Sequence, residues 1–211
     1  MKKILIYSLC CLFILYAVEQ VLELPYLIKT LIKLPLFTMY PMYTIRKMSF
    51  EIKRKEFKPV ILLSVFVFLV IIIAFLVLNS FINFYTIQND FKNRMQISTA
   101  QFMWAGIYTI VINALIEEIF FRGFIFMKLL KENRFLAYLI SAGLFAMYHM
   151  AIFKTWFSLP IFLLIMFGLF VGGLIFSYFV EKTNSFLASY MIHVSADLAV
   201  VLIGIRVLGI A

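Results

Sequence analysis

The chain has 211 residues, of which 65% are hydrophobic and only 14% charged, and its mean hydropathy is +1.06. This composition excludes a soluble globular domain and indicates an all-α protein of about six to seven transmembrane helices in a lipid bilayer. The net charge of +9 does not indicate nucleic-acid binding, because the Lys and Arg residues lie in short blocks beside apolar runs, as anionic lipids favour.

The apolar runs predict the transmembrane segments. We expect a first, retained helix over residues 4–24, because no signal-peptide cleavage site follows that run. Residues 25–58 are harder to assign, because Pro35 and Pro41 interrupt helices. The later segments are predicted at residues 60–78, 101–128, 135–153, 156–180 and 185–207.

The basic N-terminal region has two interpretations. Lys29 and Lys33 are four residues apart, as on the polar face of an amphipathic helix that lies in the membrane interface. A short, broken transmembrane segment is the alternative. We expect residues 1–99 to form N-terminal membrane helices with an interfacial basic segment, and residues 100–211 to form a core, the two making one integral domain.

The distribution of basic residues predicts the orientation. With residues 25–58 and the 128–134 link in the cytoplasm and the N-terminus outside, about twice as many Lys and Arg residues lie inside as outside. If residues 25–45 cross the membrane instead, the N-terminus is inside and the later segments keep their orientation.

Three charged residues interrupt the apolar run at residues 101–128. A charge at the bilayer centre costs at least a few kcal/mol, so Glu117, Glu118 and Arg122 need partners, water or a task. Glu118 and Arg122 are four apart and share a helix face, whereas Glu117 is turned by about 100° from Glu118. One carboxylate can therefore pair with the arginine while the other is free for chemistry. The alternative is a buried ion pair that only fixes helix packing.

The only two histidines of the chain are both expected within the membrane. His149 lies on one helix beside the carboxylates, and His193 lies on another, four residues before Asp197. A single histidine in an apolar helix is more often a packing residue, but two such residues favour a function. At about 1.5 Å per residue, we expect Glu117, both histidines and Asp197 to meet in one layer that is open to cytoplasmic water.

These residue types form a hydrolytic set. A buried glutamate can act as a general base on water, and histidines can position that water, protonate a leaving group or stabilise an oxyanion. Alternatively, zinc could be held by His149, His193 and Asp197, with a glutamate as base. The residues alone leave both routes open, although the chain lacks the HExxH pattern of common zinc proteases.

Three short motifs, each on its own predicted helix, resemble those of the CAAX-protease and bacteriocin-processing family of intramembrane metalloproteases. This family is also called CPBP or Abi and includes the eukaryotic CAAX prenyl endopeptidases. The similarity covers about residues 100–207. The motifs are Glu117-Glu118-x-x-x-Arg122-Gly123, Phe145-x-x-x-His149 and His193-x-x-x-Asp197.

The resemblance implies a role for each motif. Glu117 would activate water, with Glu118 and Arg122 supporting the site. The histidine of the second motif would hold the water or a metal ion. His193 and Asp197 would form an oxyanion-stabilising pair or supply further metal ligands. Many family members carry Asn at the position of Asp197, and the carboxylate here favours an orienting or metal-binding role.

We therefore expect an intramembrane endopeptidase that cleaves a membrane-associated peptide or protein. The abundance of Lys, Ile, Phe and Asn is typical of an AT-rich bacterium, which places the protein in a bacterial cell membrane with its active site towards the cytoplasm. The alternative is a non-catalytic bacteriocin immunity or interaction protein on the same scaffold. Ion transport is disfavoured, because the polar residues are expected in one layer rather than across the membrane. The substrate and oligomeric state are left open.

Overall fold

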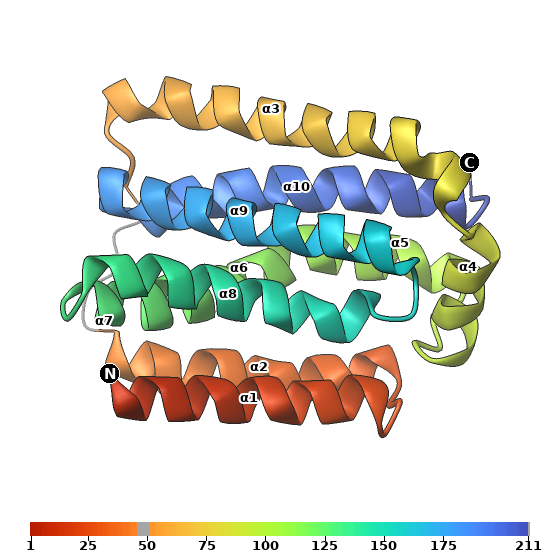
Figure 1. Cartoon of the computed structure of the whole chain (residues 1–211), viewed down its shortest axis with the longest axis horizontal. Helices are drawn as coiled ribbons and strands as arrows, with labels where there is room; N and C mark the ends of the chain where they lie inside the picture. The colour runs from red at the N-terminus through yellow and green to blue at the C-terminus, as the bar shows by residue number, and fades with distance from the viewer. Residues whose placement is uncertain (46–50, 211) are drawn as a thin grey trace.

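The computed structural model describes residues 1–45 and 51–210, and within these ranges it contains helices and no strands. The long helices lie side by side along the longest axis of the molecule (Figure 1). This confirms the all-α, polytopic membrane bundle. The elements are α1 (Lys2–Gln20), α2 (Tyr26–Thr44), α3 (Arg54–Leu78), η1 (Asn79–Phe81), α4 (Phe84–Asn93), α5 (Thr99–Tyr108), η2 (Thr109–Asn113), α6 (Ala114–Glu118), η3 (Ile119–Phe126), α7 (Met127–Leu130), α8 (Arg134–Phe153), α9 (Leu159–Thr183) and α10 (Phe186–Val207).

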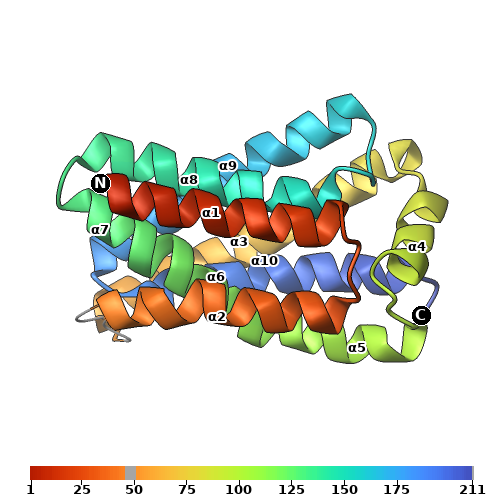
Figure 2. The ribbon, with the colours of Figure 1, turned by 90° about the horizontal axis from the view of Figure 1, so that it is seen from below.

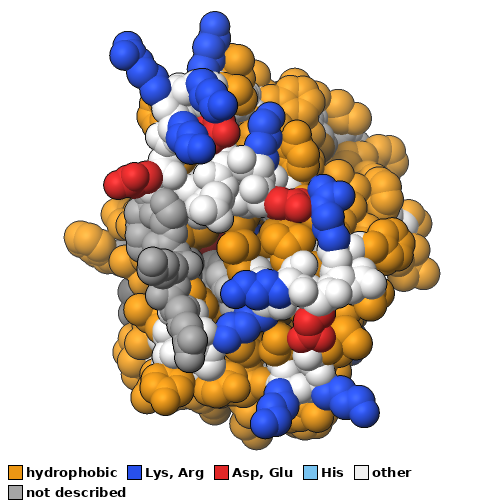
Figure 3. Space-filling view, turned by 90° about the vertical axis from the view of Figure 1, so that its left-hand side faces the viewer, with side chains coloured by type: hydrophobic (Ala, Val, Ile, Leu, Met, Phe, Trp, Pro, Cys, Tyr) orange, Lys and Arg blue, Asp and Glu red, His pale blue; other side chains and the backbone are white. Residues whose placement is uncertain are grey.

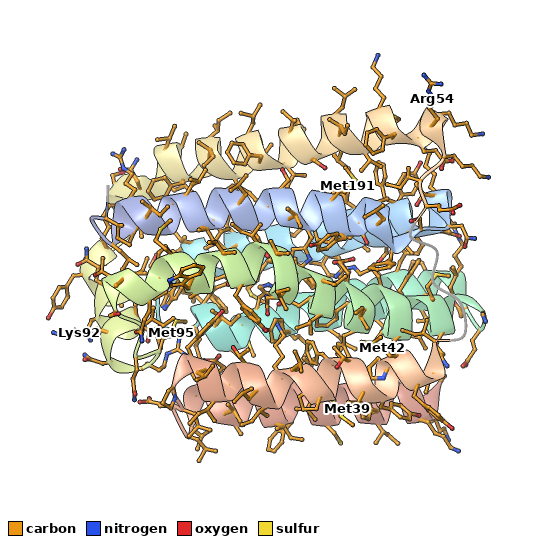
Figure 4. All side chains as sticks on the ribbon, turned by 180° about the vertical axis from the view of Figure 1, so that it is seen from behind. Met39, Met42, Arg54, Lys92, Met95 and Met191 are labelled. Carbon is orange, nitrogen blue, oxygen red and sulfur yellow. The ribbon has the colours of Figure 1, made fainter. Side chains whose placement is uncertain are left out.

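Five helices of the described chain are long and apolar enough to cross a membrane, namely α1, α3 with η1, α8, α9 and α10. The α2 helix and the run from α5 to α7 extend along the same direction (Figure 1). Arg54 and Lys92 point outward at opposite ends of the bundle, whereas mostly carbon covers its sides (Figure 4). The protein is therefore an integral membrane protein whose two polar ends flank an apolar belt.

The segment expected at residues 101–128 is one helical run from Thr99 to Leu130 with two π-helical stretches, η2 and η3. They lie directly before and after α6, the short α-helical piece that carries both carboxylates. A π-helical turn inserts extra residues into a helix and is frequent at functional sites. The irregularity therefore coincides with the residues that the sequence singled out.

Of the two interpretations of residues 25–58, the interfacial helix is wrong for residues 26–44, because Lys29 and Lys33 are buried. The alternative, a short broken transmembrane segment, is corrected only in that the helix is unbroken. The α2 helix runs without interruption through Pro35 and Pro41 and forms a hairpin with α1 against α6, η3 and α8 (Figure 2). Phe37 is fully buried and stacks on Phe120 of η3, with ring centroids 3.9 Å apart and planes 3° apart. Tertiary packing of this kind stabilises a helix that its proline content disfavours.

The hairpin also corrects the expected position of the N-terminus. The amino group of Met1 contacts Glu132 in the loop between α7 and α8, so the N-terminus shares an end of the bundle with that loop. Lys and Arg side chains gather over this end (Figure 3), which we call the basic end. The second orientation considered above is therefore the one that the fold supports. Arg46 and Lys47, which begin the basic block, lie outside the described residues.

Helices α8 and α9 approach each other closely at one glycine. A Cβ atom added at Gly173 would lie 2.8 Å from the Cα atom of Ala142 in α8. At the preceding Gly172, an added Cβ atom would have no atom of the described chain within 4 Å. The close approach therefore depends on Gly173.

We expect Gly173→Val to destabilise the protein by about 1–3 kcal/mol, because the backbone of α8 must move to admit the side chain. Gly172→Val is the matched control, with the same residue change one position earlier and open space around it. Thermal unfolding in detergent compares the two. Equal unfolding midpoints would contradict the proposed packing role of Gly173.

Candidate active site

Glu117 is almost completely buried at the centre of the cluster, with 1% of its surface exposed. Its Oε1 atom accepts hydrogen bonds from Lys33 Nζ and Asn113 Nδ2, both at 2.7 Å. Its Oε2 atom accepts none from the described chain and lies 3.8 Å from His149 Nε2 and 3.7 Å from His193 Nε2. The two oxygens therefore differ: one is anchored and the other faces two imidazoles.

His149 is placed by its own helix, α8. Its Nδ1 atom lies 2.9 Å from the carbonyl oxygen of Phe145, one turn earlier. Because a carbonyl oxygen only accepts hydrogen bonds, this contact assigns the proton to Nδ1 and leaves a lone pair on Nε2 in the neutral ring. The lone pair is on the side of the ring that faces Glu117 Oε2.

His193 lies between the two adjacent glutamates. Its Nδ1 atom is 2.9 Å from Glu118 Oε1, and its Nε2 atom is 3.7 Å from Glu117 Oε2. Asp197 is one turn later on α10, with Oδ1 also 3.7 Å from His193 Nε2. The ring of His193 thus has a carboxylate near each of its two nitrogens.

Glu118 and Arg122 form the pair that their spacing predicts, with Arg122 Nη1 3.2 Å from Glu118 Oε1. Arg122 is fully buried. Its guanidinium carbon lies 4.3 Å from the ring centroid of Phe145 and 4.8 Å from that of Phe176. Cation–π contacts with these rings and the carboxylate together stabilise the buried charge. Glu118 of this pair contacts Nδ1 of His193, whereas Glu117 lies near Nε2 on the other side of the ring.

The structure thus brings together all six residues singled out in the sequence. The prediction missed Lys33 of α2 and Asn113 of η2, which donate hydrogen bonds to Glu117 Oε1, and Tyr148 of α8, whose hydroxyl accepts one from Lys33. A signal for Lys33 was present in the sequence. Lys33 is a charge within an apolar run, and such a charge needs a partner for the same reason that Glu117 does.

A second buried charge network lies at the end of the bundle opposite the basic end. Glu19 Oε2 accepts hydrogen bonds from Lys29 Nζ and Arg94 Nη1, both at 2.6 Å. Asp90 binds Arg94 through both oxygens and also accepts a hydrogen bond from Trp156 Nε1. Burial alone would lower the pKa of Arg94, but hydrogen bonds and charge from Asp90 and Glu19 raise it above its ordinary value. The polar residues are therefore not confined to one layer, which corrects the argument used above against transport.

The donor atoms do not form a metal site in their present arrangement. Two imidazole nitrogens and a carboxylate oxygen are the types of ligand that zinc uses. Within residues 1–45 and 51–210, however, no group of three or more His, Cys, Asp or Glu side chains has an arrangement that could hold a metal ion. The ammonium of Lys33 already supplies a positive charge 2.7 Å from Glu117. Zinc bound by His149, His193 and Asp197 stays a prediction.

We expect Arg122→Met to destabilise the protein by about 3–5 kcal/mol, because Glu118 would remain buried without its cation. Arg134→Met is a matched control, since its ion pair with Glu181 lies at the surface, where such pairs contribute little. Thermal unfolding of the two variants in detergent is the measurement. A midpoint for Arg122→Met close to that of Arg134→Met would show that the buried pair is unimportant for stability.

A family model matches the part of the chain that carries these residues. Residues 99–199 match the family model described as type II CAAX prenyl endopeptidase Rce1-like. The matched range runs from α5 into α10 and includes both carboxylates of α6, both histidines and Asp197. No curated protein and no solved structure matches the chain. Residues 99–199, slightly less than half of the chain, are therefore similar to the type II CAAX prenyl endopeptidases.

Proposed function

We propose that this protein is an intramembrane endopeptidase that hydrolyses a peptide bond in a membrane-associated peptide or protein, with Glu117 as the general base. One observation carries the proposal. Glu117 Oε2 is unpaired within the described chain, and it lies 3.7–3.8 Å from Nε2 of His193 and His149. This separation is too long for a direct hydrogen bond, and we propose that one water molecule bridges these atoms. Such a water would contact the base and His149 together.

The steps follow from these atoms. The water donates one hydrogen bond to Glu117 Oε2 and one to His149 Nε2, which directs an oxygen lone pair to the carbonyl carbon of the substrate. As the new C–O bond forms, Glu117 takes the proton, and a tetrahedral intermediate with a negatively charged oxygen results. Glu117 then returns this proton to the leaving nitrogen as the C–N bond breaks.

His193 fits the role of oxyanion stabiliser. In the imidazolium form it would donate Nδ1–H to Glu118 and Nε2–H to the developing oxyanion. The carboxylate of Asp197, 3.7 Å from Nε2, would orient the ring and favour its charged form. Because the site is buried, each of these electrostatic contacts acts with little screening by water.

The cleaved substrate is proposed from the family and the surroundings of the site. A catalytic centre inside the bundle favours a chain that is itself in, or anchored to, the membrane. We propose a bacterial cell membrane with the basic end in the cytoplasm, which the Lys and Arg side chains of that end support. Access to the site from the cytoplasmic side stays a prediction.

We expect Glu117→Gln to reduce cleavage by about 100-fold or more, because a general base contributes about 10²–10⁴ to the rate. The measurement uses protein in liposomes with fluorogenic peptides, including one that ends in a prenylated cysteine followed by three residues. Mass spectrometry then locates the cut. Glu181→Gln is the control, since Glu181 pairs with Arg134 at the surface and should retain wild-type activity.

Cleavage by Glu117→Gln at the wild-type rate would overturn the proposal. The rival function, bacteriocin immunity without catalysis, predicts a different result in cells. Protection would then persist in both Glu117→Gln and His149→Phe, although neither variant cleaves any peptide.

We expect cleavage to survive removal of metal ions, because the proposed steps use only side chains and water. Protein treated with a strong zinc chelator and then dialysed should retain most of its activity. If activity is lost and zinc restores it, the zinc route predicted from the sequence replaces the one proposed here.

A further inference from the structure

Lys33 lies outside the residues that match the family model, yet its ammonium touches the proposed base. We propose that Lys33 is a positioning residue, which holds Glu117 so that Oε2 faces His149 and His193. The inference rests on the proposed function and extends the active site to α2 in the N-terminal half of the chain.

The ammonium of Lys33 uses all of its hydrogen-bonding capacity in the site. It donates to Glu117 Oε1 at 2.7 Å, to Asn113 Oδ1 at 2.5 Å and to the hydroxyl oxygen of Tyr148 at 2.7 Å. An ammonium has three N–H donors and no acceptor, so these three partners define its position. Lys33 thereby joins α2 to η2, α6 and α8.

The same contacts make the carboxylate of Glu117 asymmetric. Oε1 receives hydrogen bonds from both Lys33 and Asn113. These donors make Oε1 the less basic of the two carboxylate oxygens. Oε2 has no donor within the described residues. The side chain is therefore held in one rotamer, with the more basic oxygen towards the histidines. Without Lys33, the carboxylate could rotate away from the position that the water requires.

Lys33 itself is fixed by the helix on either side of it. One turn earlier, Lys29 binds Glu19 of α1 at 2.6 Å. One turn later, Phe37 stacks on Phe120 of η3. Cation–π contacts of the Lys33 ammonium with the rings of Tyr148 and Phe37 also favour this position, at 4.6 and 5.3 Å from their centroids. The α1–α2 hairpin thus fixes the position of the Lys33 ammonium along the bundle, next to Glu117.

Charge balance indicates the same role. Three carboxylates, those of Glu117, Glu118 and Asp197, converge on His193. Arg122 pairs with Glu118, so the matched range supplies one permanent cation to this cluster in the described structure. Lys33 supplies a second, next to Glu117. Burying a carboxylate without a cation costs free energy. The N-terminal half therefore supplies the cation that Glu117 needs.

The test compares two buried lysines on the same face of α2. Lys33→Met removes the ammonium beside Glu117, whereas Lys29→Met removes the neighbouring ammonium beside Glu19. With the peptide assay above, we expect kcat of Lys33→Met to fall about 10-fold or more while KM stays within about threefold. Lys29→Met, assayed per folded molecule, should keep its kcat within about threefold.

A second measurement does not depend on activity. Thermal unfolding of Lys33→Met, Glu117→Gln and the double variant forms a double-mutant cycle. If the two side chains interact, the double variant should lose less thermal stability than the sum of the two single losses. Additive losses would overturn the pairing on which the inference is built.

The outcomes separate the two proposals. If the wild type cleaves the peptide and Lys33→Met cleaves it equally fast, the positioning role is overturned and the proposed function is kept. Equal losses of kcat in Lys33→Met and Lys29→Met also overturn it, because any buried lysine would then have the same effect. Absence of cleavage by the wild type overturns the proposed function and the positioning role together, even where the cycle shows coupling.

Discussion

The cost of burying a carboxylate inside a membrane protein explains most of this structure. An isolated ionised group in a low-dielectric interior is strongly unfavourable, and two adjacent glutamates increase this free-energy cost. The protein resolves it with two cations from different sources. Arg122 neutralises Glu118 from within the same helical run, and Lys33 neutralises Glu117 from α2. His193 lies between the two glutamates and contacts both.

The local geometry of the carboxylate helix separates the tasks of the two glutamates. Adjacent residues on a helix point in different directions, so Glu117 and Glu118 meet different partners. The π-helical stretches lie directly before and after α6, which carries both glutamates. Glu118 is enclosed by Arg122 and His193 and has a supporting position. Glu117 keeps one oxygen free beside two imidazoles, which is what a base acting on water requires.

The N-terminal helices are part of the active-site architecture, although the family match begins at residue 99. The α1–α2 hairpin packs against η3 and α8, and its aromatic contacts, such as Phe37 on Phe120, are continuous with the core around the site. The division into residues 1–99 and 100–211 stays a prediction. The contact between Lys33 and Glu117 crosses that division directly, so the matched residues alone would leave Glu117 without a permanent cation beside it.

The sequence by itself determined the features that depend on local spacing. Apolar runs predicted the ends of the long membrane helices to within six residues. The four-residue spacing of Glu118 and Arg122 predicted their pairing, because residues one turn apart share a face. Only the tertiary structure decided the path of α2, the end at which the N-terminus lies and the partner of Glu117. The sequence pattern of two lysines one turn apart is the same for an interfacial helix as for a buried helix. The α2 helix is buried because Glu19 and Glu117 on neighbouring helices bind its two lysines. Contacts of this kind, between distant segments, are not encoded in the periodicity of either segment.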